Sequence, residues 1–223
     1  MYFRAHNILL TAAVAALTFA AFGCASTEIA KTPGNPPANA AAATAPKTLE
    51  NLQTAYNGES NANAKYLEFA KKADEEGYTK VASLFRAAAR AEEIHKSNHA
   101  EVIRKMGAEP KADIKPAEVK TTAENLKGAI EGETYERDKM YADFLVEART
   151  ANNKDAVRTF NLAKTAEAEH AKLYTEALAN LDAWKGGKIT FFVCPTCGFT
   201  SKDATLEKCP VDFTPKEKFE SIS

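Results

Sequence analysis

Residues 92–95 read Glu-Glu-Ile-His, and residues 167–170 read Glu-Ala-Glu-His. In each stretch a glutamate precedes a histidine by three positions, which places both side chains on one face of a helix. A carboxylate and an imidazole at this spacing can bind the same metal ion. One such stretch is common on a solvated helix face. Two copies, 75 residues apart, predict a repeated helical unit with a metal site in its interior.

Apolar residues around both stretches recur at three- and four-residue spacing between Thr48 and Trp184, which is the periodicity of helices. The breaks within each pair of periodic segments are short, and a longer break with two prolines separates the pairs. We therefore expect a mainly α fold, with two antiparallel hairpins packed as a four-helix bundle. The expected helices cover residues 48–75, 78–106, 121–150 and 153–184, with a connection at 107–120.

The two hairpins align with each other apart from one extra residue in the second. Glu59 corresponds to Glu133 at an offset of 74 residues, whereas Tyr66 corresponds to Tyr141 at an offset of 75. The third helix must therefore accommodate one additional residue. A helix commonly absorbs a single insertion as a π-bulge, often near a functional site. We predict a π-bulge within residues 133–141.

Further glutamates extend the metal-binding pattern to the other two helices. Glu59 lies on the first expected helix, and Glu133 and Glu136 lie three positions apart on the third. A bundle with a glutamate from each of two helices and Glu-x-x-His from each of the other two binds two iron or manganese ions. The sequence therefore predicts a dinuclear site, in which carboxylates bridge the ions. His99 follows His95 by one turn and has no glutamate three positions before it, so we predict that it lies on the surface.

The N-terminal segment has the features of an export signal. Residues 1–24 contain Arg4, then an apolar run of about 15 residues, which is shorter than the ~20 of a membrane-spanning helix. A Gly-Cys pair ends the run, and we expect lipidation of Cys24, with an ordinary signal peptide as the alternative. Residues 25–47 are rich in Pro, Ala, Thr and Asn, and we expect a flexible linker. We therefore expect an exported protein on the periplasmic side of a bacterial membrane, held there by a lipid anchor.

The composition limits the remaining possibilities. A chain of 223 residues allows one ordinary domain and one small domain. Lys and Arg number 29 against 30 for Asp and Glu, so the chain has no basic excess with which to bind nucleic acid. Four cysteines are too few for a disulfide-based scaffold of this length. Given this length, we expect the bundle to cover residues 48–185 and a second, smaller unit to follow it.

Residues 188–223 change to short β-like runs around two Cys-containing turns. Cys194-Pro-Thr-Cys197-Gly and Cys209-Pro-Val-Asp212 would form a tetrahedral iron or zinc site if all four residues were cysteines. Asp212 occupies the fourth position, and three interpretations remain open. It is an oxygen ligand, or it leaves a coordination position open, or the metal is lost and two cysteines are oxidised. The last interpretation leaves an odd thiol unpaired.

Together these motifs resemble those of rubrerythrin, over about residues 48–223. The second glutamate on the third helix, Glu136, distinguishes rubrerythrin-like sites from bacterioferritin-like ones. The resemblance rests on the following motifs: Gly58-Glu59 followed by Tyr66, Glu92-Glu-Ile-His95, Gly132-Glu133-Thr-Tyr-Glu136 followed by Met140-Tyr141, Glu167-Ala-Glu-His170, and the two Cys-containing turns.

The resemblance implies a ferritin-like bundle with a rubredoxin-like C-terminal domain, and a non-haem di-iron peroxidase that reduces hydrogen peroxide to water. Carried over to this sequence, the resemblance implies that Glu59 is a terminal ligand of one iron and that Glu133 and His170 are terminal ligands of the other. It implies that Glu92 and Glu167 bridge the two irons, and that Glu136 and His95 exchange on the first iron. It also implies that Tyr66 and Tyr141 are hydrogen-bonded to ligand carboxylates. Cys194, Cys197, Cys209 and Asp212 would hold one Fe or Zn that passes electrons to the di-iron centre.

The resemblance also implies partners. A homodimer is expected, in which the rubredoxin-like domain of one subunit contacts the bundle of the other. Because NADH is absent outside the cytoplasm, we expect an extracytoplasmic redox protein as the electron donor. Two alternatives use the same sequence features. A ferroxidase or iron-handling protein would react preferentially with O2, and a structural lipoprotein with a zinc-bound tail would hold no iron in the bundle.

Overall fold

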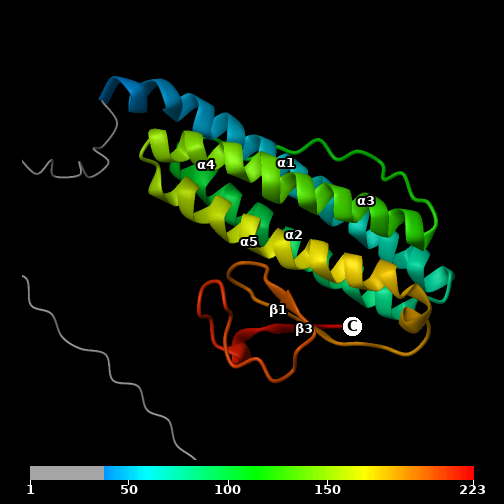
Figure 1. The fold of residues 1–223 in the computed structure, drawn as a ribbon. Coiled ribbons are helices and arrows are strands. Elements are labelled where there is room, and N and C mark those ends of the chain that lie inside the picture. The colour runs from blue at the N-terminus through cyan, green and yellow to red at the C-terminus, as the bar shows by residue number, and fades with distance from the viewer. Residues whose placement is uncertain (1–37) are drawn as a thin grey trace, which may run out of the picture. The chain divides into compact units, whose positions relative to one another are not determined.

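The computed structural model describes the backbone of residues 38–223 and the side chains from Pro46 onward. The expected signal peptide, the lipidation site at Cys24 and most of the expected linker lie outside the described residues. The described chain forms long helices followed by a small three-stranded sheet (Figure 1). None of the described helices is long and apolar enough to cross a membrane.

The first hairpin consists of α1 (Ala38–Glu75) and α2 (Thr79–Lys105), which pack along each other. Gly77 adopts a φ of +80° in the tight turn between them, a backbone conformation that glycine adopts without steric cost. The helix α1 begins ten residues before the predicted start at 48, so residues 38–47 of the expected linker are helical. Alanine has the highest helix propensity, and the alanine-rich run before Pro46 extends the helix.

The second hairpin contains the predicted π-bulge. Its first arm comprises α3 (Thr122–Tyr135), the π-helical turn η1 (Glu136–Met140) and α4 (Tyr141–Thr150), and its second arm is α5 (Lys154–Ala179). The π-turn lies inside the predicted interval, where the insertion between the two repeats falls. The prediction is therefore confirmed, and Glu136 is its first residue.

The connection between the hairpins runs along α1 (Figure 1). Side-chain amides of α1 hold it: Gln53 accepts a hydrogen bond from the backbone N–H of Lys111, and Asn57 accepts one from Asp113. The next hairpin then begins at Thr121, whose hydroxyl and backbone form a capping box with Glu124. These contacts fix where α3 starts, and hence where its glutamates lie.

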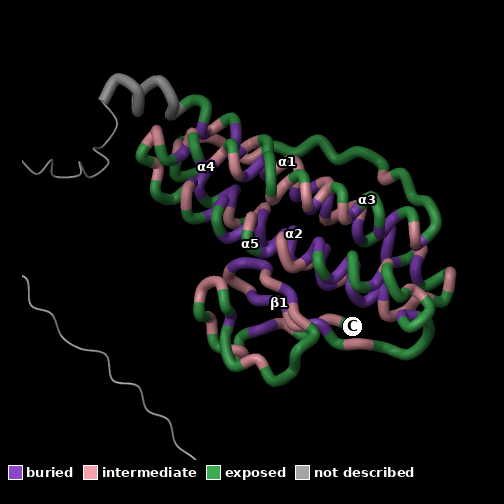
Figure 2. Tube along the Cα trace, in the orientation of Figure 1, coloured by how far each residue is buried: buried purple, intermediate pink, exposed green. Residues whose placement is uncertain are grey.

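The buried face of each helix points into the bundle (Figure 2). One apolar cluster surrounds Tyr66, Phe85 and Tyr174, and a second surrounds Tyr141 and Phe160. The two clusters lie on either side of the predicted metal-ligating residues. The site is therefore enclosed by apolar side chains at both ends, which excludes bulk water from it.

A small sheet follows the bundle, after the short 3-10 helix η2 (Leu181–Trp184). It contains β1 (Phe191–Val193), β2 (Thr200–Ser201) and β3 (Glu220–Ile222), in the antiparallel order β2-β1-β3, with the 3-10 helix η3 (Lys216–Lys218) before β3. The sheet packs on α2 of its own chain, where Arg90 donates two hydrogen bonds to the Glu220 carboxylate at 2.6 and 2.7 Å. The expectation of a small β-rich C-terminal unit is confirmed.

Candidate metal centre

Two groups of four ligand-type side chains meet in the middle of the bundle. In each group the ligand atoms lie within 4.8 Å of one another, and all of these residues are buried. The groups are Glu59, Glu92, His95 and Glu167, and Glu92, Glu133, Glu167 and His170. Because both groups contain Glu92 and Glu167, those two carboxylates lie where they can bridge a pair of ions. The bundle thus brings together six of the seven residues predicted to bind the two metals.

Several buried carboxylate oxygens of this cluster have no hydrogen-bond partner among the described residues. One oxygen each of Glu59, Glu92 and Glu133 has no hydrogen-bond partner within the described part of the chain. The histidines compensate only in part: His95 Nδ1 lies 2.9 Å from Glu167 Oε1, and His170 Nδ1 lies 2.9 Å from Glu167 Oε2. Buried carboxylates without partners are costly, and bound cations remove that cost. The donor set therefore fits two metal ions.

Burial and mutual repulsion shift the pKa values in this cluster. Burial raises the pKa of Glu92 well above its ordinary value, and the Glu167 charge adds to the effect. The same two causes raise the pKa of Glu133 from 4.5 to about 7. Burial acts in the same direction on Glu167, but the imidazoles of His95 and His170 outweigh it and hold its pKa below the ordinary value. Glu92 and Glu133 therefore resist being ionised together in the metal-free cluster.

Glu136 belongs to neither group of four. It begins the π-turn and keeps part of its surface exposed, whereas the other predicted glutamate ligands are buried. Burial of its carboxyl group, followed by the charge of Glu59, raises its pKa well above the ordinary value. The residue therefore lies at the edge of the cluster, close enough to interact with it electrostatically. Its role as an exchanging ligand stays a prediction.

Two buried tyrosines occupy equivalent positions in the two hairpins. Tyr66 donates a hydrogen bond to Glu133 Oε1 at 2.7 Å, and Tyr141 donates one to Glu59 Oε1. Burial raises the pKa of both phenols, with the nearby glutamates contributing, so both hydroxyl groups stay protonated. Each tyrosine therefore contacts a predicted terminal ligand that comes from a different helix.

The prediction that His99 lies on the surface is wrong. His99 is fully buried, with Nε2 3.0 Å from the Tyr141 hydroxyl and Nδ1 2.9 Å from the Thr159 hydroxyl. The error came from requiring a glutamate three positions earlier, although a residue four positions after His95 lies on the same inward face of α2. Sequence reasoning also missed Thr159, a common residue type with no motif around it. Burial lowers the pKa of His99, so this imidazole is neutral.

The C-terminal unit gathers the second predicted set of ligands. Atoms of Cys194, Cys197, Cys209 and Asp212 lie within 4.8 Å of one another, with Asp212 Oδ2 3.4 Å from Cys194 Sγ. The backbone N–H groups of the turns point at the sulfur atoms, as with Val211 N and Cys209 Sγ at 3.4 Å. The three described cysteines are free thiols. This arrangement suits a metal with a mixed sulfur and oxygen donor set.

A hydrogen bond connects the two centres within one chain. His95 Nε2 lies 2.9 Å from the backbone oxygen of Cys197, while its Nδ1 faces the carboxylates. The next residue, Gly198, has a φ of +77°, and a Cβ atom there would lie 2.4 Å from His95 Nε2. Only glycine allows this approach of the tail to the bundle. On the other side, His170 Nε2 lies 3.2 Å from the Thr200 hydroxyl.

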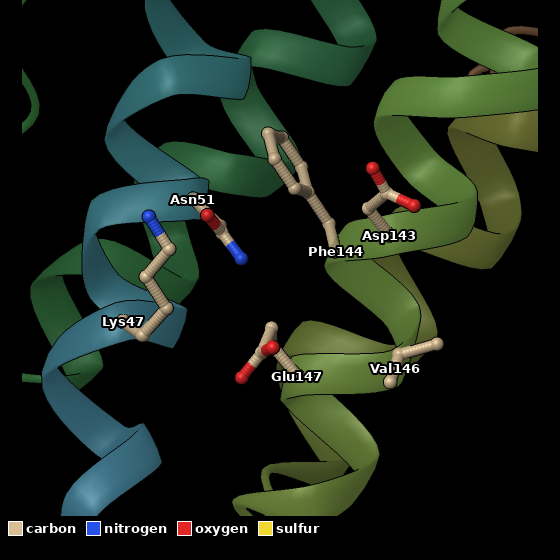
Figure 3. A pocket seen from close by; sticks show the side chains of 6 residues that line it. All are labelled: Lys47, Asn51, Asp143, Phe144, Val146 and Glu147. Carbon is tan, nitrogen blue, oxygen red and sulfur yellow. The ribbon is translucent and has the colours of Figure 1, made fainter.

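A surface hollow lies elsewhere, between α1 and α4 (Figure 3). It measures about 390 Å³, and Figure 3 shows Lys47 and Asn51 on α1 across from Phe144 and Glu147 on α4. None of the predicted ligands lines it. The buried carboxylate cluster, rather than this hollow, is therefore the candidate site.

Comparisons with known proteins agree with the ligand pattern. The family model described as Rubrerythrin matches residues 50–178. Nigerythrin from Nitratidesulfovibrio vulgaris is 41% identical over 174 residues, covering 77% of this chain and 85% of the relative. Rubrerythrin-2 from Clostridium acetobutylicum is 37% identical over 186 residues, covering 78% and 96%.

Solved structures show the same fold. The structure of fully reduced, all-ferrous nigerythrin has a TM-score of 0.73 and 36% identity, covering 87% of this chain and 90% of that chain. The Desulfovibrio desulfuricans bacterioferritin, with a TM-score of 0.58 and 22% identity over 64% of this chain and 84% of that chain, shares the fold alone. The mainly helical ferritin-like bundle with a small C-terminal sheet is thus confirmed. The chain belongs to the rubrerythrin family.

Proposed function

We propose that this protein is a non-haem di-iron peroxidase that reduces hydrogen peroxide to water. The observation that carries the proposal is the pair of buried four-residue groups that share Glu92 and Glu167. Such a pair suits two ions held side by side, and reduction of peroxide to two waters consumes two electrons and two protons. The similarity to nigerythrin and rubrerythrins supports this class of oxidoreductase.

The residues divide into ligands and groups that handle protons. Two bound ferrous ions would supply both electrons at once, which avoids release of a radical. Glu59 and His95 would hold one ion, Glu133 and His170 the other, with Glu92 and Glu167 between them. We propose that Glu136 and His95 exchange as ligands of the first iron. The position of Glu136 at the start of the π-turn supports this proposal. The apolar clusters at either end keep bulk water away from these groups.

The C-terminal site is proposed as the entry point for electrons. The hydrogen bond between His95 and the Cys197 carbonyl supports a short route from a metal on the thiolates to the bundle. Iron is the proposed metal, because zinc has no redox chemistry. Asp212 is proposed as the fourth ligand, since its carboxylate lies among the three sulfur atoms.

The surroundings of the protein are a further part of the proposal. Export and a lipid anchor at Cys24 would place the domain on the periplasmic side of a membrane. An extracytoplasmic redox protein would then supply electrons, and the chain would form a homodimer. The proposals of export, anchoring and donor rest on the sequence of residues 1–47, and the homodimer rests on the resemblance to rubrerythrins.

A ligand variant with a matched control tests the proposed activity. Glu92→Gln should reduce the iron content of the bundle from two ions to one or none, with loss of peroxide consumption. Glu93→Gln is the control, because Glu93 is adjacent on α2 but forms a partly exposed ion pair with Lys96. Two irons and full peroxide consumption in Glu92→Gln would refute the proposed site.

A further inference from the structure

A line of buried polar side chains joins the candidate metal centre to a small surface hollow between α2 and α5. Its members are Glu59, Tyr141, His99 and Thr159, which come from α1, α4, α2 and α5. Glu59, Tyr141 and His99 are fully buried, and Thr159 is 4% exposed. Consecutive members are hydrogen-bonded, at 3.0 Å between His99 and Tyr141 and 2.9 Å between His99 and Thr159. Each of the four arms of the two hairpins thus contributes one member.

The hydrogen bonds in this line have one consistent direction. The carboxylate oxygen of Glu59 accepts the hydrogen bond, so Tyr141 donates its single proton to it. Tyr141 must then accept from His99, which requires a proton on Nε2. The other ring nitrogen, Nδ1, is left to accept from the Thr159 hydroxyl. All three donors therefore point toward Glu59.

The outer end of the line reaches solvent. Thr159 lines a hollow of about 30 Å³, which is large enough to hold a water molecule. The other lining residues are mostly polar or charged and include Asn98, Glu101, Lys105, Asp155 and Arg158. A water in this hollow could exchange protons with bulk solvent and with the Thr159 hydroxyl. The structure therefore offers a source of protons at one end and a ligand carboxylate at the other.

We propose that Thr159, His99 and Tyr141 relay protons from solvent to Glu59 during turnover. The proposal rests on the proposed function, because peroxide reduction consumes two protons in a site closed to bulk water. A water in the hollow donates a proton to the Thr159 hydroxyl as Thr159 passes its own proton to His99 Nδ1, and bulk solvent replaces the proton that this water gives up. His99 releases its Nε2 proton to Tyr141, and Tyr141 releases its proton to Glu59.

The transfer is balanced at every position. One proton enters at Thr159 and one arrives at Glu59, and no electron moves along the line. His99 changes tautomer and stays neutral, in keeping with its surroundings of Tyr141 and Phe160. One pass delivers one proton and leaves His99 as the Nδ1–H tautomer, so its return to Nε2–H requires exchange of its ring protons with solvent before the next pass. The competing explanation is that Thr159 and Tyr141 only satisfy the buried imidazole, without any transfer.

Two conservative variants and a control separate these explanations. Thr159→Val removes the first hydroxyl at constant shape. His99→Gln keeps one donor and one acceptor, but an amide does not exchange its protons as an imidazole does. Thr165→Val is the control, because Thr165 lies on α5 and its exposed hydroxyl donates to Asn161 of the same helix.

The kinetic measurement is anaerobic oxidation of the iron-loaded, reduced protein by hydrogen peroxide in H2O and in D2O. Positioned proton transfer contributes about 10²–10⁴ in rate, so Thr159→Val and His99→Gln should each slow oxidation at least about tenfold. Both should also show a larger solvent isotope effect, while Thr165→Val matches the parent protein. Parent-like rates and isotope effects in both variants would overturn the relay. If the parent protein reacts with O2 instead of peroxide, the proposed function fails, and the same comparison with O2 still decides the relay.

A spectroscopic measurement tests the direction without turnover. In the zinc-loaded protein, ¹⁵N NMR should show His99 as the neutral Nε2–H tautomer. The Nδ1 resonance should shift in Thr159→Val and stay in place in Thr165→Val. A proton on Nδ1 of His99 in the parent protein would contradict the relay.

Discussion

The raised pKa of Glu133 makes the metal-free protein less stable at neutral pH than at mildly acidic pH. Burial and the charge of Glu167 raise that pKa from 4.5 to about 7. Between these two values the folded protein keeps a proton that the unfolded chain has released, so stability falls as pH rises. One pKa unit corresponds to about 1.4 kcal/mol. The free energy of unfolding of the metal-free protein should therefore fall by about 3 kcal/mol between pH 4.5 and pH 7 because of Glu133 alone. Above pH 7 its contribution is constant.

Urea denaturation of the metal-free protein measures this effect. The variant Glu133→Gln has no proton to lose at this position, and it also removes the Glu133 charge that raises the pKa values of Glu92 and His170. The stability of Glu133→Gln relative to the parent should therefore improve by about 3 kcal/mol between pH 4.5 and pH 7.5. Glu131→Gln, at an exposed position on the same helix, should show no such change. An equal difference between parent and Glu133→Gln at both pH values would refute the account of burial at this site.

Three further variants test separate parts of the site. Glu136→Ala should slow peroxide turnover at least about tenfold with little loss of stability, because the residue is only partly buried, and unchanged peroxide kinetics would remove its assigned role. Asp212→Cys should change the metal content and absorption spectrum of the C-terminal site, whereas an unaltered spectrum would show that Asp212 is no ligand. Gly198→Ala should lower the free energy of unfolding by about 1–2 kcal/mol for the left-handed backbone, and by more for the contact of the new Cβ with His95. The variant should also slow electron transfer into the bundle. Parent-like electron transfer would contradict the route through His95.

The helical part of the fold could be predicted because its signals are local. The three- and four-residue periodicity identified the helices. Comparison of the repeats predicted a π-turn within residues 133–141, and the structure places it at Glu136–Met140. The start of α1 at Ala38 was missed because a segment rich in Ala, Pro and Thr has no amphipathic pattern, although its alanines favour a helix. Helix propensity and linker-like composition point in opposite directions there.

Parts of the site depend on contacts that the sequence does not reveal. Glu92 and Glu167 could be placed by spacing, since each belongs to a Glu-x-x-His motif. Thr159 could not, because its role follows from how α5 packs against α2. The close approach of Gly198 to His95 is likewise a property of how the tail packs on the bundle. Such contacts between segments distant in sequence are where structure adds most to the sequence.

Anaerobic stopped-flow oxidation tests the central proposal most directly. The iron-loaded, fully reduced protein is mixed with hydrogen peroxide in one experiment and with O2 in another, at equal concentrations. If the two iron sites that share Glu92 and Glu167 form a peroxidase centre, hydrogen peroxide should oxidise the reduced irons rapidly and O2 should oxidise them slowly. Faster oxidation by O2 would assign the site to oxidase or iron-handling chemistry, and no reaction with either oxidant would contradict a redox-active di-iron centre.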